Sequence, residues 1–262
     1  MKYALIILVT LISLNQKTSA QTVKYNYVIS YKYTFQNDKN DSNSMDYEDM
    51  ILLINDKKSY FISRTTFQKD TMAQKNKEPL SLTEALEARK KFPKVRVKFE
   101  IEKSKSENNY AYYEKIFTTT YRAKYKSDAI IWKLVNEKKT INGYDCRKAE
   151  TSFAGRNYIA WYAEEIPMSD GPYKFQGLPG LILEVTDDKK EHSFVMKGLQ
   201  KQSIEYTPTH KNIVETNMKE IQVGRANLMN NIKNSGFNIS PELMQAAKEK
   251  NLKNNNHIEI IN

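Results

Sequence analysis

Three acidic side chains, Glu164, Glu165 and Asp170, are the best candidates for acid–base chemistry in this sequence. Two carboxylates about 5 to 10 Å apart can serve as the acid and base of a glycosidase. Glu164 and Glu165, however, end an aromatic run that reads as a strand, and adjacent strand residues point to opposite faces. These two cannot line one cleft together. We expect all three acids to be ordinary surface residues. The alternative is a hydrolase that uses the acids near the loop at residues 164–170.

The histidines do not indicate a metal site. His192, His210 and His257 are far apart, and none has a second ligand at metal spacing. Residues 187–192 gather three acids and a histidine, but they lie between two strand patterns and read as a solvated hairpin turn. No nucleophile elbow, zinc-binding helix, phosphate loop or C-x-x-C pair occurs. We therefore expect no metal and no cofactor.

Cys146 is the only cysteine, so no internal disulfide can form and the fold must rest on its core. A lone thiol near methionine sulfurs could bind copper or take part in redox chemistry. A small buried residue on a strand is the commoner role of such a cysteine. We expect the buried role and keep the copper or redox protein as an alternative.

The stretch GPYKFQGLPGLILEV, residues 171–185, requires unusual control of the backbone. Leu178-Pro179-Gly180-Leu181 has the composition of a type II turn, in which glycine supplies a positive φ at the third position. The segment from Pro167 to Gly180 is long for a hairpin connection, a length class in which binding loops occur. We expect Lys174 to be exposed. Tyr173, Phe175 and Leu178 either plug an open end of the sheet or contact a ligand.

Strand patterns dominate the chain. The run at residues 24–35 alternates at period two, and a hairpin is indicated from Tyr47 to Phe67 around the turn NDKK. Further short strands follow up to residue 206, with hairpin-length connections, which favours an antiparallel meander over a βαβ fold. The sequence predicts a mainly β single domain: a curved antiparallel sheet or open half-barrel, with late helices covering it.

Helical patterns are confined to three places. Residues 80–92 contain a capping-box spacing from Ser81 to Glu84. Residues 212–232 have apolar positions at helical spacing, and residues 240–252 begin with Ser240 as a cap and Pro241 at the first helical position. We expect residues 254–262 to form a polar, frayed tail.

The first 20 residues, with Lys2, an apolar run and small residues before Ala20, are typical of a secretory signal peptide. The apolar run is too short for a membrane span, so we expect no stable membrane anchor. The formal charge of +10 comes mostly from lysines spread between acids, which disfavours nucleic-acid binding. The boundaries predicted are a signal peptide at 1–20, a β-rich domain at 21–253 and the tail.

Residues 141–185 resemble the signature of the GLPGLI family of exported proteins. The resemblance rests on Ile141 to Cys146, Gly155 to Tyr158, Trp161, Tyr162, Ile166, Pro167, Gly171, Pro172 and the hexapeptide Gly177 to Ile182. It implies a Gram-negative envelope setting, typical of Bacteroidota, and brings neither an established activity nor catalytic residues. A weaker similarity, to exported half-barrels of the lipoprotein-sorting type, supports only the expected fold.

These observations predict an exported, non-catalytic protein that binds an apolar small molecule or an envelope protein partner. We expect it in the periplasm, with association with the outer membrane or secretion as alternatives. The expected site is a groove between the sheet and the helices, beside the loop from Pro167 to Gly180. A fully packed interior is the structural alternative. The candidate binding or motif residues are Trp161, Tyr162, Pro167, Gly171, Pro172, Phe175, Gly177, Leu178, Pro179, Gly180, Leu181 and Ile182, with Leu183 contributing to the same surface.

Overall fold

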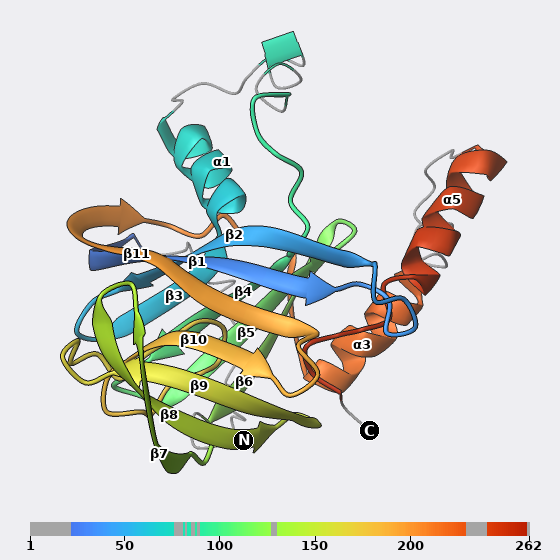
Figure 1. Cartoon of the computed structure of the whole chain (residues 1–262). Helices are drawn as coiled ribbons and strands as arrows, with labels where there is room; N and C mark the ends of the chain where they lie inside the picture. The colour runs from blue at the N-terminus through green and yellow to red at the C-terminus, as the bar shows by residue number, and fades with distance from the viewer. Residues whose placement is uncertain are drawn as a thin grey trace, which may run out of the picture.

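The computed structural model describes residues 22–75, 81, 83–84, 87, 90–126, 130–228 and 240–260. Its centre is one curved sheet of twelve strands (Figure 1). The strands are β1 (Val23–Gln36), β2 (Met45–Ile54), β3 (Lys58–Ser63), β4 (Phe99–Ser104), β5 (Asn109–Ile116), β6 (Thr119–Lys126), β7 (Lys133–Ile141), β8 (Tyr144–Phe153), β9 (Arg156–Ala163), β10 (Leu181–Asp187), β11 (His192–Tyr206) and β12 (Ile213–Thr216).

The order of the strands is β12-β6-β5-β4-β3-β2-β1-β11-β10-β9-β8-β7. Most neighbours are antiparallel and follow one another along the chain, as the succession of short strand patterns predicts. The first strand lies in the middle of the sheet, where β1 pairs with β11 and β2. Because β12 and β7 lie at opposite edges, the sheet does not close into a barrel. The predicted mainly β, open and curved fold is confirmed.

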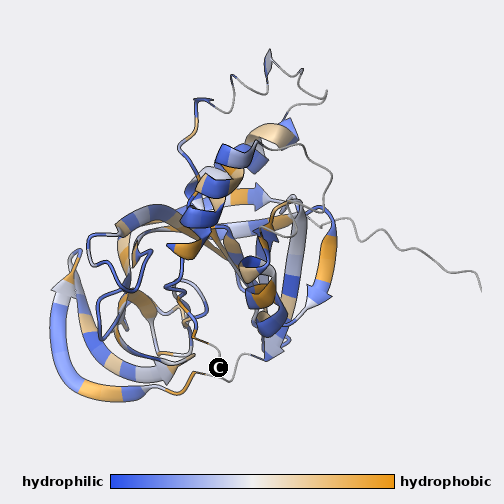
Figure 2. Cartoon of the chain, turned by 90° about the vertical axis from the view of Figure 1, so that its right-hand side faces the viewer, coloured by the Kyte–Doolittle hydropathy of each residue, from blue (hydrophilic) through white to orange (hydrophobic). Residues whose placement is uncertain are grey.

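The main core lies on one side of this sheet and draws inward-facing residues from most strands. Ile29, Tyr31 and Tyr33 alternate with less buried residues along β1 and belong to this core. In Figure 2 the curved strands at the left carry both hydrophilic (blue) and hydrophobic (orange) segments. A two-residue period therefore gives these strands one apolar face and one wetter face.

β2 is buried on both faces, which explains its unbroken apolar run MILLI. Leu52 belongs to the main core, whereas Ile51 and Leu53 belong to a second cluster with Tyr60 and Tyr206. The first helix, α1 (Arg64–Lys75), packs near β2 and β3 and places Phe67 against the second cluster. The sequence interpretation extended the β3 strand to Phe67, and this was wrong because α1 begins at Arg64.

The late helices differ partly from expectation. Residues 213–216 were expected to be helical but form β12, which pairs in parallel with β6, whereas the other described strand pairs are antiparallel. The helix α3 (Met218–Ala226) then begins, with Asn217 as its cap, and buries Met218 and Ile221. The helix α5 (Pro241–Leu252) has the predicted Ser240 cap and Pro241 at its start. It projects from the sheet and is largely exposed (Figure 1).

Two other predictions fall partly or wholly outside the described residues. Ser81 and Glu84 do form the reciprocal hydrogen bonds of a capping box, while much of the helix expected after them is not described. The proposed signal peptide also lies outside the described residues. Within the part of the chain that is described, no helix is both long and apolar enough to cross a membrane.

Candidate functional site

After β9 the chain turns inward and runs along the inside of the curved sheet before it returns as β10. In this loop, residues 164–180, the side chains of Tyr173, Phe175 and Leu178 are at most 1% exposed. Phe175 packs against Tyr158 with ring centroids 4.7 Å apart. Tyr173 has a φ of 54°, an uncommon value for a residue with a side chain. The three side chains are therefore buried against the sheet, in agreement with the prediction that they plug it.

A buried ion pair fixes the loop to β4. The Nζ atom of Lys103 lies 2.5 Å from Oδ1 of Asp170, and each side chain is 1% exposed. Lys103 also donates to the carbonyl of Gly171 at 2.7 Å, and the Gly171 amide donates to Asp170 at 2.8 Å. Burial lowers the pKa of Lys103, an effect that Asp170 opposes. Removing either partner would leave the other charge buried and unpaired.

A second buried cation, Lys174, holds the centre of the same loop. Its Nζ lies 2.5 Å from Oε1 of Glu259 in the C-terminal segment. The rings of four tyrosines surround the ammonium at 4.7 to 5.5 Å, a distance at which cation–π attraction operates. These are Tyr110, Tyr112, Tyr125 and Tyr173. Lys174 is 2% exposed, so the expectation that it lies on the surface was wrong.

The C-terminal segment, residues 254–260, is bound along the start of β9. Arg156 donates to the side-chain oxygen of Asn256 and to the carbonyl of His257 at 3.0 Å, and Tyr158 donates to the carbonyl of Ile258 at 3.0 Å. A Cβ on Gly155 would meet Ile260 at 2.9 Å. The frayed tail expected from its polar composition is therefore absent over these residues, because buried partners capture it. The G-R-x-Y sequence at residues 155–158 thus forms the surface against which the C-terminal segment packs.

Gly180 is required for a different reason from the one predicted. It lacks the positive φ of a type II turn, and in this loop Gly177 has that conformation, with a φ of 94°. A Cβ on Gly180 would lie 2.1 Å from the carbonyl oxygen of Ala163. Real side chains do not tolerate such a contact. Glycine is thus needed at 180 because β10 begins directly against the end of β9, and the type II turn assignment was wrong.

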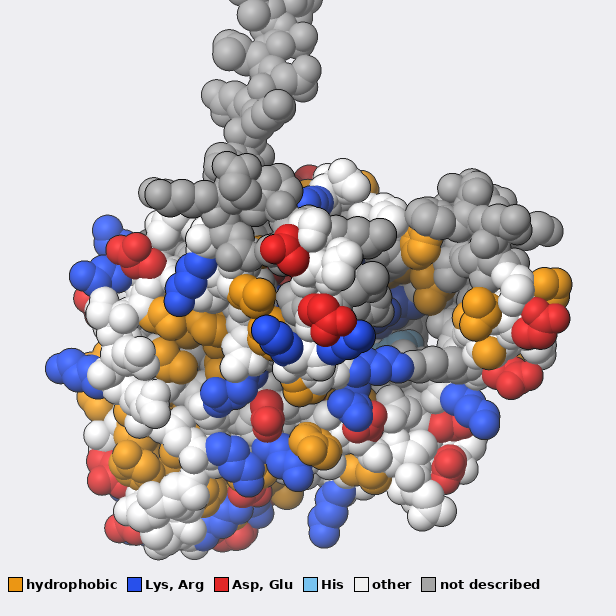
Figure 3. All heavy atoms as spheres, turned by 90° about the horizontal axis from the view of Figure 1, so that it is seen from above, with side chains coloured by type: hydrophobic (Ala, Val, Ile, Leu, Met, Phe, Trp, Pro, Cys, Tyr) orange, Lys and Arg blue, Asp and Glu red, His pale blue; other side chains and the backbone are white. Residues whose placement is uncertain are grey.

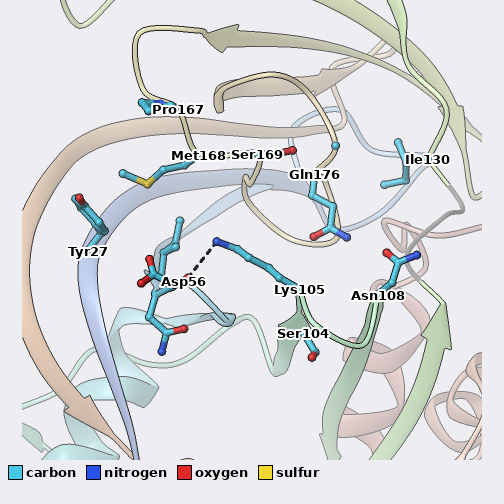
Figure 4. Close-up of a pocket in the computed structure, with 13 residues that line it drawn as sticks. Tyr27, Asp56, Ser104, Lys105, Asn108, Ile130, Pro167, Met168, Ser169 and Gln176 are labelled. Atoms are coloured by element: carbon cyan, nitrogen blue, oxygen red, sulfur yellow. Dashed lines mark hydrogen bonds between the residues drawn. The ribbon is translucent and has the colours of Figure 1, made fainter.

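A pocket of about 530 Å³ lies beside this loop. Figure 4 shows Pro167, Met168 and Ser169 on one side and Ser104, Lys105 and Asn108 on the other. Its walls combine apolar and polar groups, and the volume falls in the range of pockets that hold small molecules. The remaining lining residues are Tyr27, Ile54, Asn55, Asp56, Ile130, Gln176 and Gly177.

The pocket is held by the ion pair described above. Lys103, on β4, fixes Asp170 of the loop, while the next residues of the same chain segment, Ser104 and Lys105, line the pocket. Lys105 crosses toward the β2–β3 turn and donates to the carbonyl of Asn55 at 3.0 Å. The two walls are thus connected by a buried charge pair. Such an arrangement is preorganised, which lowers the entropic cost of binding.

Only two of the predicted binding residues, Pro167 and Gly177, line this pocket. Trp161 lies on the other face of β9, where Lys139 sits over its ring at 4.5 Å. Pro172 is buried and Pro179 is exposed. The buried remainder, which packs in or around the core, consists of Tyr162, Gly171, Phe175, Leu178, Gly180, Leu181, Ile182 and Leu183.

The predicted acids do not gather into one site. Glu164 pairs with Arg147 at 3.1 Å, and Glu165 accepts a hydrogen bond from the Asp145 amide at 3.0 Å. Asp170 is buried against Lys103. Cys146 is a buried free thiol, and burial raises its pKa to about 11. Among the described residues, no group of His, Cys, Asp and Glu is arranged to hold a metal ion.

Sequence reasoning missed Lys103, Lys174 and Glu259. A signal existed for Lys103, because it lies two residues after the buried Ile101 and so faces inward on β4. No comparable local signal marks Lys174 or Glu259, since their pairing joins segments that are distant in sequence.

Residues 154–184 match a family model described as a protein of unknown function, Porph_ging. The matched segment holds Gly155, Arg156 and Tyr158, which bind the C-terminal segment, and both Asp170 and Lys174. It therefore coincides with the loop and the buried charges described above. Because the family is described as of unknown function, the match assigns no activity to this chain.

Solved structures give a more distant similarity. Two structures of PNGF-II, in the P21 and C2 space groups, match with TM-scores of 0.51 and 0.50 at 15% identity. The match covers 76% of this chain but only 33% and 32% of PNGF-II, so this chain corresponds to about a third of that protein. At this identity the similarity concerns the fold alone. No curated protein sequence matches the chain.

Proposed function

We propose that this protein is an exported, non-catalytic binding protein of the cell envelope, with its ligand site in the pocket beside the 167–177 loop. Export is supported by the signal-peptide pattern of residues 1–20. The envelope setting is supported by the GLPGLI resemblance of residues 141–185. The observation that carries the binding role is the preorganised pocket of about 530 Å³.

The lining favours an amphiphilic small molecule. Tyr27, Ile54 and Met168 supply apolar surface, which an aliphatic or aromatic part of a ligand would cover. Asp56 and Ser104 supply polar groups at the same site, suited to a hydrogen-bonding head. The sequence predicted an apolar ligand, and the lining of this pocket favours an apolar ligand that also has a polar end. The pocket lies between the loop and strand ends, whereas the sequence placed the groove against the helices.

A titration with a fluorescent amphiphile, 1-anilinonaphthalene-8-sulfonate, tests this site. We expect saturable binding to the folded protein and at least a tenfold loss of affinity in Met168→Asp, because a charge is placed on the apolar wall. The matched control is Met45→Asp, at an exposed position that begins β2. Absence of saturable binding, or equal weakening by both substitutions, would contradict the proposal.

The natural ligand is then sought by native mass spectrometry and organic extraction of protein purified from its own periplasm. A bound molecule with an apolar and a polar part, absent from the Met168→Asp protein, would support the site. Recovery of the protein in the cytoplasm with an uncleaved leader would refute the proposed export.

A further inference from the structure

A second and separate pocket, of about 150 Å³, lies between the sheet and the late helices. We name it the His192 pocket. Its walls come from β1, the segment before β4, the end of β5, the start of β11, α3, the end of α5 and the C-terminal segment. Seen from above, a hollow beside the helical side of the molecule contains a histidine side chain and is bordered by lysines and arginines (Figure 3).

Two buried side chains of this pocket have a polar nitrogen without a hydrogen-bond partner among the described residues. They are Nε2 of His192, a residue that is 1% exposed, and Nδ2 of Asn256, a residue that is 8% exposed. A buried polar group without a partner costs about 1 to 3 kcal/mol. Both side chains belong to the lining of this pocket.

The surrounding hydrogen bonds orient the Asn256 amide and leave two tautomers for His192. Arg156 can only donate, and it donates to Oδ1 of Asn256, so the amide NH₂ is the unpartnered end. Nδ1 of His192 lies 2.8 Å from the hydroxyl of Tyr33. Burial lowers the pKa of His192 to about 3, so the ring is neutral, and either tautomer is compatible with this contact. When Tyr33 donates to Nδ1, the ring proton is on Nε2, and the proposed site uses this tautomer.

The charges around the pocket are mainly positive. Lys98 and Lys115 line it and are exposed, and Arg96 and Arg225 also belong to its wall. Of these, Arg225 is already paired with Glu114, and Arg96 with Asp46. The lysines form no ion pair with the described residues. Two donors within a lysine-lined hollow are suited to an anion that accepts hydrogen bonds through oxygen.

We propose that the His192 pocket binds a small anion through carboxylate or phosphate oxygens, which accept from His192 and Asn256 and are attracted by Lys98 and Lys115. The volume admits a small molecule and is too small for a drug-sized ligand. Because Asn256 belongs to the C-terminal segment, such a ligand would join that segment to β11. This site is independent of the pocket beside the loop.

Isothermal titration calorimetry of the full protein with sodium phosphate and, separately, with sodium succinate tests the proposal at constant ionic strength. We expect one equivalent of at least one anion to bind, and the two titrations distinguish phosphate from carboxylate recognition. Asn256→Asp keeps the acceptor for Arg156 but replaces the donor by a negative charge, and should weaken binding at least tenfold. Asn136→Asp, on exposed β7, makes the same charge change and should leave affinity unchanged.

Two further variants keep the test decisive if Asn256→Asp does not fold. His192→Phe removes the second donor while keeping a planar ring beside Tyr33, and Lys115→Gln changes only an exposed side chain. Both should weaken the anion several-fold. The proposal fails if neither anion binds saturably, if the folded pocket variants bind as the parent does, or if Asn136→Asp weakens binding equally.

Discussion

Lys174 and Glu259 form a buried ion pair, with 2.5 Å between Nζ and Oε1, that connects the centre of the inward loop to the C-terminal segment. Tyr173 donates to the same carboxylate at 2.7 Å. Two charges that are both nearly fully buried depend on each other, because neither can recover the solvation it lost. The order of the C-terminal segment and the packing of the loop are therefore linked.

Glu259→Ala should destabilise the protein by about 3 to 5 kcal/mol, because Lys174 would remain buried among tyrosines without a counterion. Glu259→Gln should cost less, since it still accepts a hydrogen bond. Urea unfolding measures both, with Glu249→Ala on exposed α5 as the control. A Glu259→Ala protein as stable as the parent would show that the pair does not hold the tail in solution.

The second prediction concerns the ion pair that fixes the loop beside the pocket. Lys103→Met and Asp170→Asn should each lower the free energy of unfolding by about 3 to 5 kcal/mol. The double variant should lose less than the sum of the single losses, because no unpaired charge remains. Additive losses in urea unfolding would mean that the two side chains do not interact. Lys124→Met, at an exposed position of β6, is the control.

Gly180→Ala tests the close approach of β10 to the end of β9. The added methyl group would lie 2.1 Å from the Ala163 carbonyl oxygen, so the strands must separate. Overpacking of this kind costs about 1 to 3 kcal/mol. Thermal unfolding should show a clear loss of stability, whereas Pro179→Ala, at an exposed neighbouring position, should change stability little. Equal midpoints for Gly180→Ala and the parent would contradict the geometry.

The sequence predicts the sheet well because each strand carries its own period-two pattern, as β1 does from Val23 to Gln36. It fails at α1, where Thr65 and Thr66 are β-branched and favour a strand, while packing of Phe67 on the second cluster supports the helix. β12 is missed because its parallel pairing with β6 depends on a distant strand rather than on its own four residues.

The candidate site is less predictable for the same physical reason. Aromatic and glycine residues of the 171–185 stretch are recognisable locally, but their role in the core depends on which charges meet there. From the sequence alone, Lys174 looks like a surface lysine. Its buried position becomes evident only in the fold, where four tyrosines and Glu259 surround it. The pocket beside the loop joins three separate turns. Its lining residues carry no shared local pattern, so only the fold assembles them.

Cys146 should be chemically inert in the folded protein. It is 1% exposed, and burial raises the pKa of its thiol to about 11, so little thiolate forms near neutral pH. An aromatic disulfide reagent such as 5,5′-dithiobis(2-nitrobenzoate) should react slowly at pH 8 in buffer and rapidly in urea. Rapid release of one equivalent of thiolate dye from the native protein would instead support a redox or copper role.

Stability should fall as the pH is lowered below about 6.5, and two buried histidines should contribute. Burial lowers the pKa of His192 to about 3 and that of His257 to about 4. The unfolded chain therefore takes up these protons at a higher pH than the native protein does. Their contribution is fully present above the unfolded value and is lost as pH falls toward 4, by about 1.4 kcal/mol per pH unit for each histidine.

Urea unfolding at pH 7.5, 6.0 and 5.0 measures this loss, and His192→Phe isolates one part of it. The variant can be less stable at every pH, since Tyr33 loses its partner, but its stability should decline less steeply between pH 6 and 5. The acidic groups are the same in both proteins, so their contribution to the pH dependence of the unfolding free energy cancels in that comparison. Parallel declines in the parent and the variant would show that His192 is protonated equally in the folded and unfolded states, and so is not held neutral in the pocket.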